Sequence, residues 1–234
     1  MSTRGPGEEL RLATRDIRRV PRRSQGRVSP SKAPVAPANY RGISLDERRA
    51  LRRERLIASA VDLYGERGYR DVTVRTICQR ARLTERYFYE AFASNEDILV
   101  VAARTLAART HDRMRQLRDS VEGDRDAKTL RMLKGYYRSQ IDEPTKARVF
   151  TLEFRGISAD ADAEFERILD MFAELIVETR DPMRRGRAAN DRLVRRGVVG
   201  GVLQITIAWI ESGYREPIDT VVSAATYVCS LADP

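Results

Sequence analysis

Helical periodicity runs through almost the whole chain after residue 43, and it restricts the fold more than any other feature of the sequence. The clearest example is an apolar stripe with three- and four-residue spacing between residues 160 and 180. No segment sustains the alternation of apolar and polar residues that a half-buried strand would show. We therefore expect an all-α fold. The stripe consists of Phe165, Ile168, Leu169, Phe172, Leu175, Ile176 and Thr179.

Capping residues and helix breakers divide this pattern into about nine helices. Ser44 with Glu47 is a capping box, and Ser94 with Asp97 is a variant of it, so a helix should begin after each serine. Pro144 and Pro217 stand where first-turn prolines belong. The expected helices run from Ser44 to the break at Gly65–Gly68, over 73–81 and 84–92, from Ser94 to before Gly123, and over 126–141, 143–156, 160–180, 188–212 and 217–231.

Residues 1–43 differ from the rest of the chain in composition and charge. They contain five prolines and few large apolar residues, so we expect them to be disordered. Ten Lys or Arg against three acids give this segment a net charge of +7, out of +9 for the whole chain. The tail is either a solvated leader or an arm that contacts phosphates and the minor groove of DNA.

Several classes of protein are disfavoured by what the chain contains. His111 is its only histidine, which leaves no multi-histidine metal site within one chain. Cys78 and Cys229 lie far apart in helical patterns, as buried, reduced thiols would. The longest apolar run, Val198 to Ile210, is short of a membrane span, and the N-terminal residues show no hydrophobic signal-peptide core. We expect a cytoplasmic protein that is not an enzyme and carries no cofactor.

The helices expected at 73–81 and 84–92 are joined by about three residues, which is the spacing of a helix-turn-helix. In such a pair the second helix can enter the major groove of DNA. Its polar residues near the N-terminus are then candidates for contacts with bases, and hydroxyls at helix N-termini are candidates for contacts with phosphates. These candidates are Thr73, Thr84, Glu85, Arg86, Tyr87 and Tyr89.

An ordinary structural role is open for the same residues. Tyr87 and Tyr89 can be packing aromatics, and Arg86 can form a solvated ion pair with Glu90 four residues later. The pattern alone does not decide between these roles and contact with DNA.

The stretch Arg53–Leu99, RERLIASAVDLYGERGYRDVTVRTICQRARLTERYFYEAFASNEDIL, resembles the DNA-binding domain of the TetR family of transcriptional repressors. The likeness covers about a fifth of the chain. The matching positions, in order and spacing, are the aromatic that ends the first helix, Gly68, Tyr69, Thr73, Ile77, Cys78, Ala81, Thr84, Tyr89, Phe92, Ser94, Glu96 and Leu99.

This resemblance implies a homodimer whose N-terminal helix-turn-helix domains read a near-palindromic operator. It also implies a divergent helical domain that holds an effector pocket and the dimer contact. On this basis we expect a basic tail at 1–43, a DNA-binding domain at 44–94, and an effector-binding and dimerisation domain at 95–234.

The chain departs from the family pattern at several positions. Arg82 stands where the turn usually has glycine, Arg86 and Tyr87 replace small residues of the recognition helix, and Asn95 replaces a lysine that opens the next helix. A recognition face this bulky predicts an unusual operator or a shifted docking. Arg82 or the tail is a candidate to replace the phosphate contact of the missing lysine.

Candidate residues for the pocket and the dimer contact come from the later helices. Large side chains between 95 and 180 that can line a pocket are Met114, Tyr137, Phe150, Phe154 and Phe172, although each also fits a plain core. Apolar residues of the last two helices that can form a four-helix interface, or be buried within one chain, are Val198, Val202, Ile205, Trp209, Val221, Val222 and Ala225.

The sequence thus predicts a ligand-responsive, DNA-binding repressor released by a small, apolar effector. The rival within the same fold is an accessory or architectural DNA-binding protein without an effector. A helical enzyme is the rival from another class, and the chain has neither a histidine-centred site nor a glycine-rich phosphate loop to support it. Neither the operator sequence nor the identity of the effector follows from the sequence.

Overall fold

The computed structural model describes residues 44–180 and 189–233. These residues form nine α-helices, and none of them belongs to a strand. The all-α prediction is confirmed. The helices are α1 (Leu45–Arg67), α2 (Val74–Ala81), α3 (Glu85–Tyr89), α4 (Asn95–Asp119), α5 (Arg125–Asp142), α6 (Pro144–Arg148), α7 (Ala159–Arg180), α8 (Ala189–Glu211) and α9 (Ile218–Ser230). A 3₁₀ turn, η1 (Tyr69–Asp71), follows α1, and a π-helical segment, η2 (Val149–Glu153), follows α6. The expectations for residues 1–43 lie outside the described residues.

Local hydrogen bonds start the helices where the sequence signals lie. The Ser44 hydroxyl accepts from the Glu47 amide at 3.1 Å, and the Glu47 carboxylate accepts from the Ser44 amide at 2.7 Å. This bond from Ser44 lowers the pKa of Glu47. At α4 the Ser94 hydroxyl accepts from the Asp97 amide at 3.1 Å, whereas Asp97 accepts from Ala93 rather than from Ser94. Both predicted starts are therefore capped by side chains.

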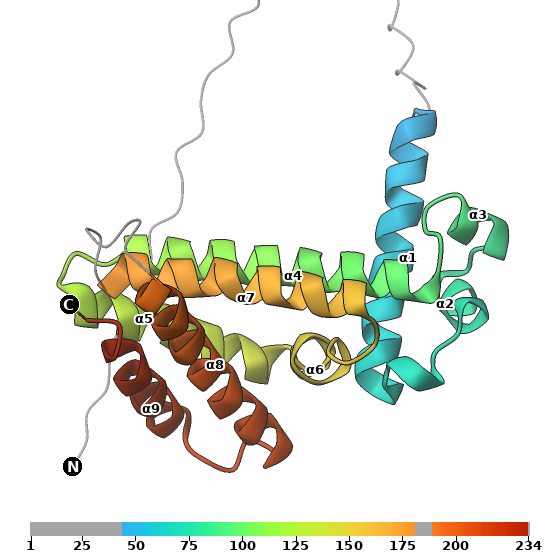
Figure 1. Cartoon of the computed structure of the whole chain (residues 1–234). Coiled ribbons are helices and arrows are strands. Elements are labelled where there is room, and N and C mark those ends of the chain that lie inside the picture. Colours follow the sequence, from blue (N-terminus) through green and yellow to red (C-terminus); the bar gives the residue numbers. More distant parts are fainter. Residues whose placement is uncertain (1–43, 181–188, 234) are drawn as a thin grey trace, which may run out of the picture. The chain divides into compact units, whose positions relative to one another are not determined.

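The helices pack into one unit whose two ends differ (Figure 1). At one end α1 contacts α2, α3 and α4. At the other end α4, α5 and α7 pack together, and α8 and α9 pair with each other while α9 lies against α5. The short helix α6 lies crosswise between this bundle and α1. A continuous apolar core joins the two ends.

Two expected helices differ in detail from the structure. The segment expected as one helix over 143–156 is α6 followed by π-helical η2, and Phe150 and Phe154 both pack against Phe165. The helix expected over 84–92 ends at Tyr89, because the amides of Ala91 and Phe92 both turn back to the Phe88 carbonyl. Each difference involves packing or a shared hydrogen bond, and the spacing of apolar residues in the sequence does not reveal either.

Helix α8 is the most apolar long helix among the described residues. By length and composition, Arg192–Glu211 could cross a membrane, although the core helix of a soluble protein passes the same test. Only 39% of its apolar window is buried inside the protein. The rest of this window is therefore wholly or partly open on the surface of the protomer.

Candidate nucleic-acid interface and internal cavity

Helices α2 and α3 form a compact pair joined by residues 82–84. The Thr73 hydroxyl accepts from the Thr76 amide at 3.3 Å and caps α2. The chain then turns through Arg82, whose φ of 53° and ψ of 45° are left-handed. The Leu83 amide donates to the Cys78 carbonyl at 2.9 Å and closes this turn. The predicted helix spacing is thus realised by a capped start and a left-handed end.

Buried apolar side chains hold the pair together and fix it to α1. Ile77, Cys78, Phe88 and Phe92 are each at most 3% exposed. The Arg55 guanidinium, on α1, donates to the Ala81 carbonyl at 2.6 Å. Burial raises the pKa of the Cys78 thiol, so this cysteine remains a neutral packing residue. The orientation of α3 is therefore set by the burial of its Phe88 in the core that α1 and α2 share with it.

All the predicted DNA-contacting residues are exposed: Thr73, Arg82, Thr84, Glu85, Arg86, Tyr87 and Tyr89. Thr84 is the N-cap residue of α3, but its hydroxyl makes no capping bond. Arg86 pairs with Glu90 at 3.1 Å, which is the ion pair that the structural alternative expected. The guanidinium is nevertheless 85% exposed at the side-chain level, so the pair leaves it accessible to a ligand.

Arg52 on α1 is part of this surface, and sequence reasoning missed it. Its guanidinium carbon lies 4.5 Å from the ring centre of Tyr87, a cation–π contact that couples α1 to α3. The two residues are 35 positions apart, so no local pattern links them. Arg53 stacks similarly on Phe92 at 5.0 Å.

Asn95 has a structural role at the junction with α4. Its backbone carbonyl and its amide oxygen accept from the Tyr64 hydroxyl at 3.0 and 2.8 Å. Its amide nitrogen donates to the Val72 carbonyl at 2.9 Å. Burial raises the pKa of Tyr64, which keeps this hydroxyl a donor. Asn95, which stands in place of the usual lysine, therefore links α1 and the backbone at Val72 to the start of α4.

A cavity of about 120 Å³ lies among α4, α5, α6, η2, α7 and α8. Of the five residues predicted to line a pocket, Met114, Phe150 and Phe172 do so. Tyr137 and Phe154 are fully buried in the core instead, where Tyr137 packs against Trp209 and Phe154 against Phe165. In the described part of the chain, no group of three or more His, Cys, Asp or Glu could hold a metal ion.

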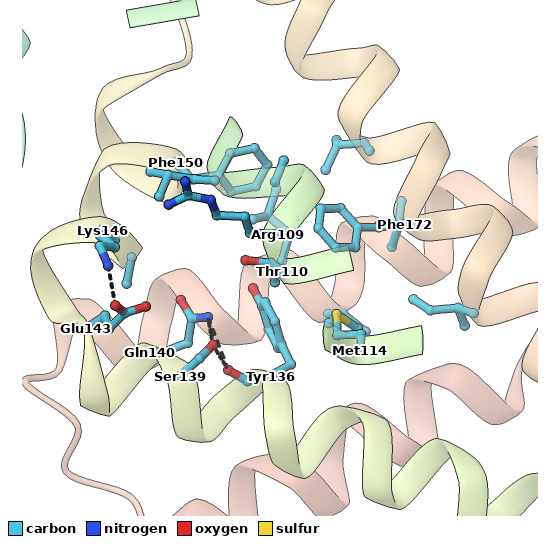
Figure 2. A pocket seen from close by; sticks show the side chains of 18 residues that line it. Arg109, Thr110, Met114, Tyr136, Ser139, Gln140, Glu143, Lys146, Phe150 and Phe172 are labelled. Atoms are coloured by element: carbon cyan, nitrogen blue, oxygen red, sulfur yellow. Dashed lines mark hydrogen bonds and ion pairs between the residues drawn. The ribbon is translucent and has the colours of Figure 1, made fainter. Parts of the chain in front are cut away.

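Polar side chains that sequence reasoning missed also line the cavity: Arg109, Thr110, Tyr136, Ser139, Gln140, Glu143 and Lys146. Figure 2 shows Arg109, Gln140, Glu143 and Lys146 toward one end, with Met114 and Phe172 toward the other. Gln140 had a recognisable signal, because it continues the apolar spacing of Leu133 and Tyr137 with a polar residue. The two ends of the cavity thus differ in chemistry.

The wall of the cavity formed by α6 and η2 touches the DNA-binding end directly. A Cβ added to Gly65 on α1 would lie 2.3 Å from the Thr145 methyl carbon and 2.4 Å from the Thr145 carbonyl oxygen. The Glu153 carboxylate at the end of η2 accepts from the Tyr69 amide at 2.9 Å. Phe150, which lines the cavity, belongs to the same π-helical segment. The cavity wall therefore contacts α1 and η1 directly, and α1 in turn packs against α2 and α3.

Most residues predicted for a dimer contact are buried inside the protomer. Val198, Val202, Trp209, Val221, Val222 and Ala225 are at most 6% exposed, and Ile205 is partly exposed. This placement agrees with the alternative that these residues are buried within one chain. The dimer contact itself stays a prediction. The exposed apolar side chains on this part of the molecule are instead Leu193, Tyr227 and Leu231, at 67%, 73% and 62% exposure.

Comparison with known protein families gives a match in the N-terminal part of the described chain. Residues 56–103 match the family model described as bacterial regulatory proteins, tetR family. No curated protein matches the chain.

Solved structures resemble most of the described fold. The fatty acid degradation regulator FadR from Bacillus halodurans is 18% identical with a TM-score of 0.65, over 76% of this chain and 97% of its own. FadR from Bacillus subtilis, in complex with stearoyl-CoA, is 17% identical with the same TM-score and coverage. A tetR-family transcriptional regulator from Streptomyces coelicolor is 19% identical with a TM-score of 0.63, over 78% of this chain and 80% of its own.

Proposed function

This chain belongs to the TetR family of bacterial transcriptional regulators, and from that premise we propose that it is a homodimeric, cytoplasmic repressor released by a small effector. Its DNA-binding domain spans 44–94, and its effector-binding and dimerisation domain spans 95–234. The observation that carries the proposal is the exposed polar face of α3 on a buried scaffold, with a cavity behind it.

Contact with DNA is supported by the way apolar and polar residues of α2 and α3 are separated between the core and the surface. Their apolar residues are used in the core, so the polar residues are free to face a duplex. Arg86 can bond to both acceptors of a guanine edge once its exposed pair with Glu90 opens, and Thr84 can donate to a phosphate. Arg82 adds a cation at the turn, with no ion-pair partner among the described residues.

Homodimerisation is supported by the surface of α8 and α9. Much of the apolar window of α8 is not buried within the protomer, and Leu193, Tyr227 and Leu231 are exposed nearby. A second copy that covered this surface would form a four-helix contact with two-fold symmetry. Two recognition helices related in this way can read half-sites about one DNA turn, or about 34 to 36 Å, apart.

Release by an effector is supported by the direct contact of the cavity wall with α1 and η1, since α1 packs against α2 and α3. A ligand that moved Phe150 or Lys146 would move η2 or α6, which bear on Tyr69 and Gly65 of the DNA-binding end. Two protomer conformations with different spacing of the recognition helices would then have different affinity for the operator. The stearoyl-CoA bound by FadR from Bacillus subtilis is in keeping with an effector that has an apolar part.

The experiment is selection of binding sites from a random duplex library with the full chain, followed by fluorescence anisotropy on selected and scrambled DNA at matched salt. We expect a preference of about a thousandfold or more for the selected site. Arg86→Ala should cost about 1 to 3 kcal/mol on that site and relax its base preference, whereas Thr84→Ala should weaken all sequences more evenly. Equal binding to both DNAs would favour the architectural rival over a repressor.

A further inference from the structure

Gln140 makes the cavity more than an apolar void. Its side chain is 94% buried, since only 6% is exposed, and its amide nitrogen donates to the Tyr136 carbonyl and the Ser139 hydroxyl, both at 3.2 Å. A backbone carbonyl can only accept, so the nitrogen must face Tyr136 and the amide oxygen must face away. No residue that the structure describes donates to this oxygen. The oxygen is not sealed from solvent, so it can accept a hydrogen bond from water or from a ligand in the cavity.

Arg109 supplies a positive charge at the same end (Figure 2). It forms no ion pair or hydrogen bond with residues in the described ranges. The second cation of this end, Lys146, is neutralised by its ion pair with Glu143. Arg109 is exposed, so solvent as well as the cavity reaches its guanidinium, and no described carboxylate pairs with it. Guanidinium groups bind carboxylates through two parallel hydrogen bonds.

The other end of the cavity is apolar where Met114 and Phe172 line it. Phe150 lies toward Arg109 and stacks on Phe165. The volume of about 120 Å³ is below the roughly 300 to 1,000 Å³ of pockets for drug-sized ligands. These features favour a small ligand with a short apolar body.

We propose that the cavity binds a short- or medium-chain carboxylic acid that carries a hydrogen-bond donor beside its carboxylate. Arg109 holds the carboxylate, the donor satisfies the Gln140 amide oxygen, and the chain lies against Met114 and Phe172. A 3-hydroxyalkanoate has this arrangement of groups. The inference rests on the proposed function, because it specifies the effector class of that regulator.

The test is isothermal titration calorimetry of the full chain with octanoate, its neutral counterpart octanamide, and 3-hydroxyoctanoate. We expect octanoate to bind about tenfold to a hundredfold more tightly than octanamide, as a charge-assisted hydrogen bond would produce. 3-Hydroxyoctanoate should bind about threefold to tenfold more tightly than octanoate, because its hydroxyl pairs with Gln140.

Two variants assign these preferences to their residues. Arg109→Gln should bring octanoate within about twofold of octanamide, and binding of octanamide that is still measurable would show that the cavity has kept its shape. Gln140→Met should abolish the advantage of the hydroxy acid and retain the advantage of octanoate over octanamide. Arg115→Gln is the matched control, because Arg115 lies on α4 about 240° around the helix from Arg109 and outside the cavity lining.

Equal affinity of wild type for octanoate and octanamide would overturn the inference, as would a preference that survives Arg109→Gln or the lack of binding by either acid. Anisotropy on the selected operator without ligand separates this result from the proposed function. Specific operator binding with no acid binding would remove only the ligand class. Acid binding without specific operator binding would remove the repressor and leave the ligand site standing.

Discussion

Arg82 ends α2 in a left-handed backbone conformation that its side chain makes unfavourable. Such a conformation costs a residue with a Cβ about 1 to 2 kcal/mol, and glycine avoids this cost. Retaining arginine in the turn of a helix-turn-helix therefore requires a compensating benefit. The exposed guanidinium beside the DNA-facing helix is the candidate for that benefit.

Arg82→Gly should separate the two effects. Because the strain disappears, we expect the free energy of unfolding to rise by up to about 1 kcal/mol, partly offset by the greater freedom of glycine in the unfolded chain. Because a phosphate contact is lost, affinity should fall on all DNA sequences, and the log–log salt slope should change by roughly 0.9. Urea unfolding and salt-dependent anisotropy measure the two. Arg82→Lys, which keeps the charge and the strain, is the control, and an unchanged salt slope in Arg82→Gly would rule out the contact.

The stacked pair of Arg52 and Tyr87 is the second feature at this scale. The contact orders the Tyr87 ring of the recognition helix before DNA binds. The effects of substituting Arg52 and Tyr87 on operator affinity should therefore be coupled. We expect Arg52→Ala and Tyr87→Ala to weaken operator binding by amounts that fail to add by about 0.5 to 1 kcal/mol in the double variant.

A double-variant cycle measured by anisotropy on the selected operator tests this coupling. Tyr87→Phe should retain it, because the ring face is unchanged. Arg49→Ala, on the same helix but paired with Asp46, is the control cation. Strict additivity of Arg52→Ala and Tyr87→Ala would show that the stacking does not prepare the surface for DNA.

At the scale of elements, α1 and α6 approach each other closely at Gly65. A substitution there has two opposing effects on stability, and the size of each is known. Helix propensity alone would make Gly65→Ala stabilising by about 1 kcal/mol. The new Cβ would, however, lie 2.4 Å from the Thr145 backbone oxygen, which cannot rotate away. Overpacking of this kind costs about 1 to 3 kcal/mol, so we expect a net loss of stability.

Urea unfolding of Gly65→Ala measures this balance. Ala58→Gly is the matched control, because Ala58 is exposed on the same helix and reports propensity alone, at about 1 kcal/mol of destabilisation. A Gly65→Ala variant more stable than wild type would mean that α6 can move away at little cost. In that case the cavity wall would be too compliant to transmit a change in the cavity.

Elements were largely predictable where their signals are local. Ser44, Thr73 and Ser94 cap the helices that the sequence assigned to them, because a cap involves residues only three positions apart. The π-helical turn of η2 was not predictable, because Phe150 and Phe154, four residues apart, share a side in an ordinary α-helix as well, and their partner Phe165 lies on another helix. The pairing of Arg52 with Tyr87 was not predictable either, because these residues also lie on different helices.

The cavity was predictable in part for the same reason. Large apolar residues mark the region where a void can form, but only three of the five candidates face it, since face and depth depend on the neighbouring helices. Arg109 gives no sign of its role in the sequence, because exposed arginines are common in this chain. Gln140 does give one, since a polar residue at an apolar position of a helix needs a partner.

At the scale of the whole molecule, a buried cation ties the end of the chain to the bundle. Arg180, only 2% exposed at the end of α7, donates to both carboxylate oxygens of Asp233 at 2.7 and 2.5 Å and also bonds to Asp126 at the start of α5. The hydrogen bond from Arg180 holds the pKa of Asp233 below its usual value, against the opposing effect of burial. Three distant segments thus meet at one guanidinium.

This arrangement predicts a loss of stability in acid. A lowered folded-state pKa means that the charged carboxylate of Asp233 stabilises the fold fully above its unfolded-state pKa of about 3.9. Its contribution is lost as pH falls from there through the folded-state pKa. Asp233→Asn should lower the free energy of unfolding at pH 7 by about 1 to 3 kcal/mol, less than for an isolated buried pair because Asp126 remains.

Urea unfolding at fixed protein concentration from pH 7 to pH 2.5 tests this prediction, and Asp233→Asn should show a shallower decline than wild type. Asp219→Asn is the control, because Asp219 forms an exposed pair with Lys134 and should matter by less than about 0.5 kcal/mol at pH 7. Parallel pH curves for wild type and Asp233→Asn would show that Asp233 is not the group responsible.

The single tryptophan gives the protein an intrinsic optical reporter. Trp209 is 3% exposed, its indole nitrogen donates to the Glu216 carbonyl at 2.9 Å, and its ring meets those of Tyr137 and Tyr214. Tyr137 in turn contacts Tyr136, which lines the cavity. All tryptophan emission therefore comes from one dry environment two rings from the ligand site. Its wavelength and its quenching by acrylamide can follow occupancy of the cavity and unfolding without any attached dye.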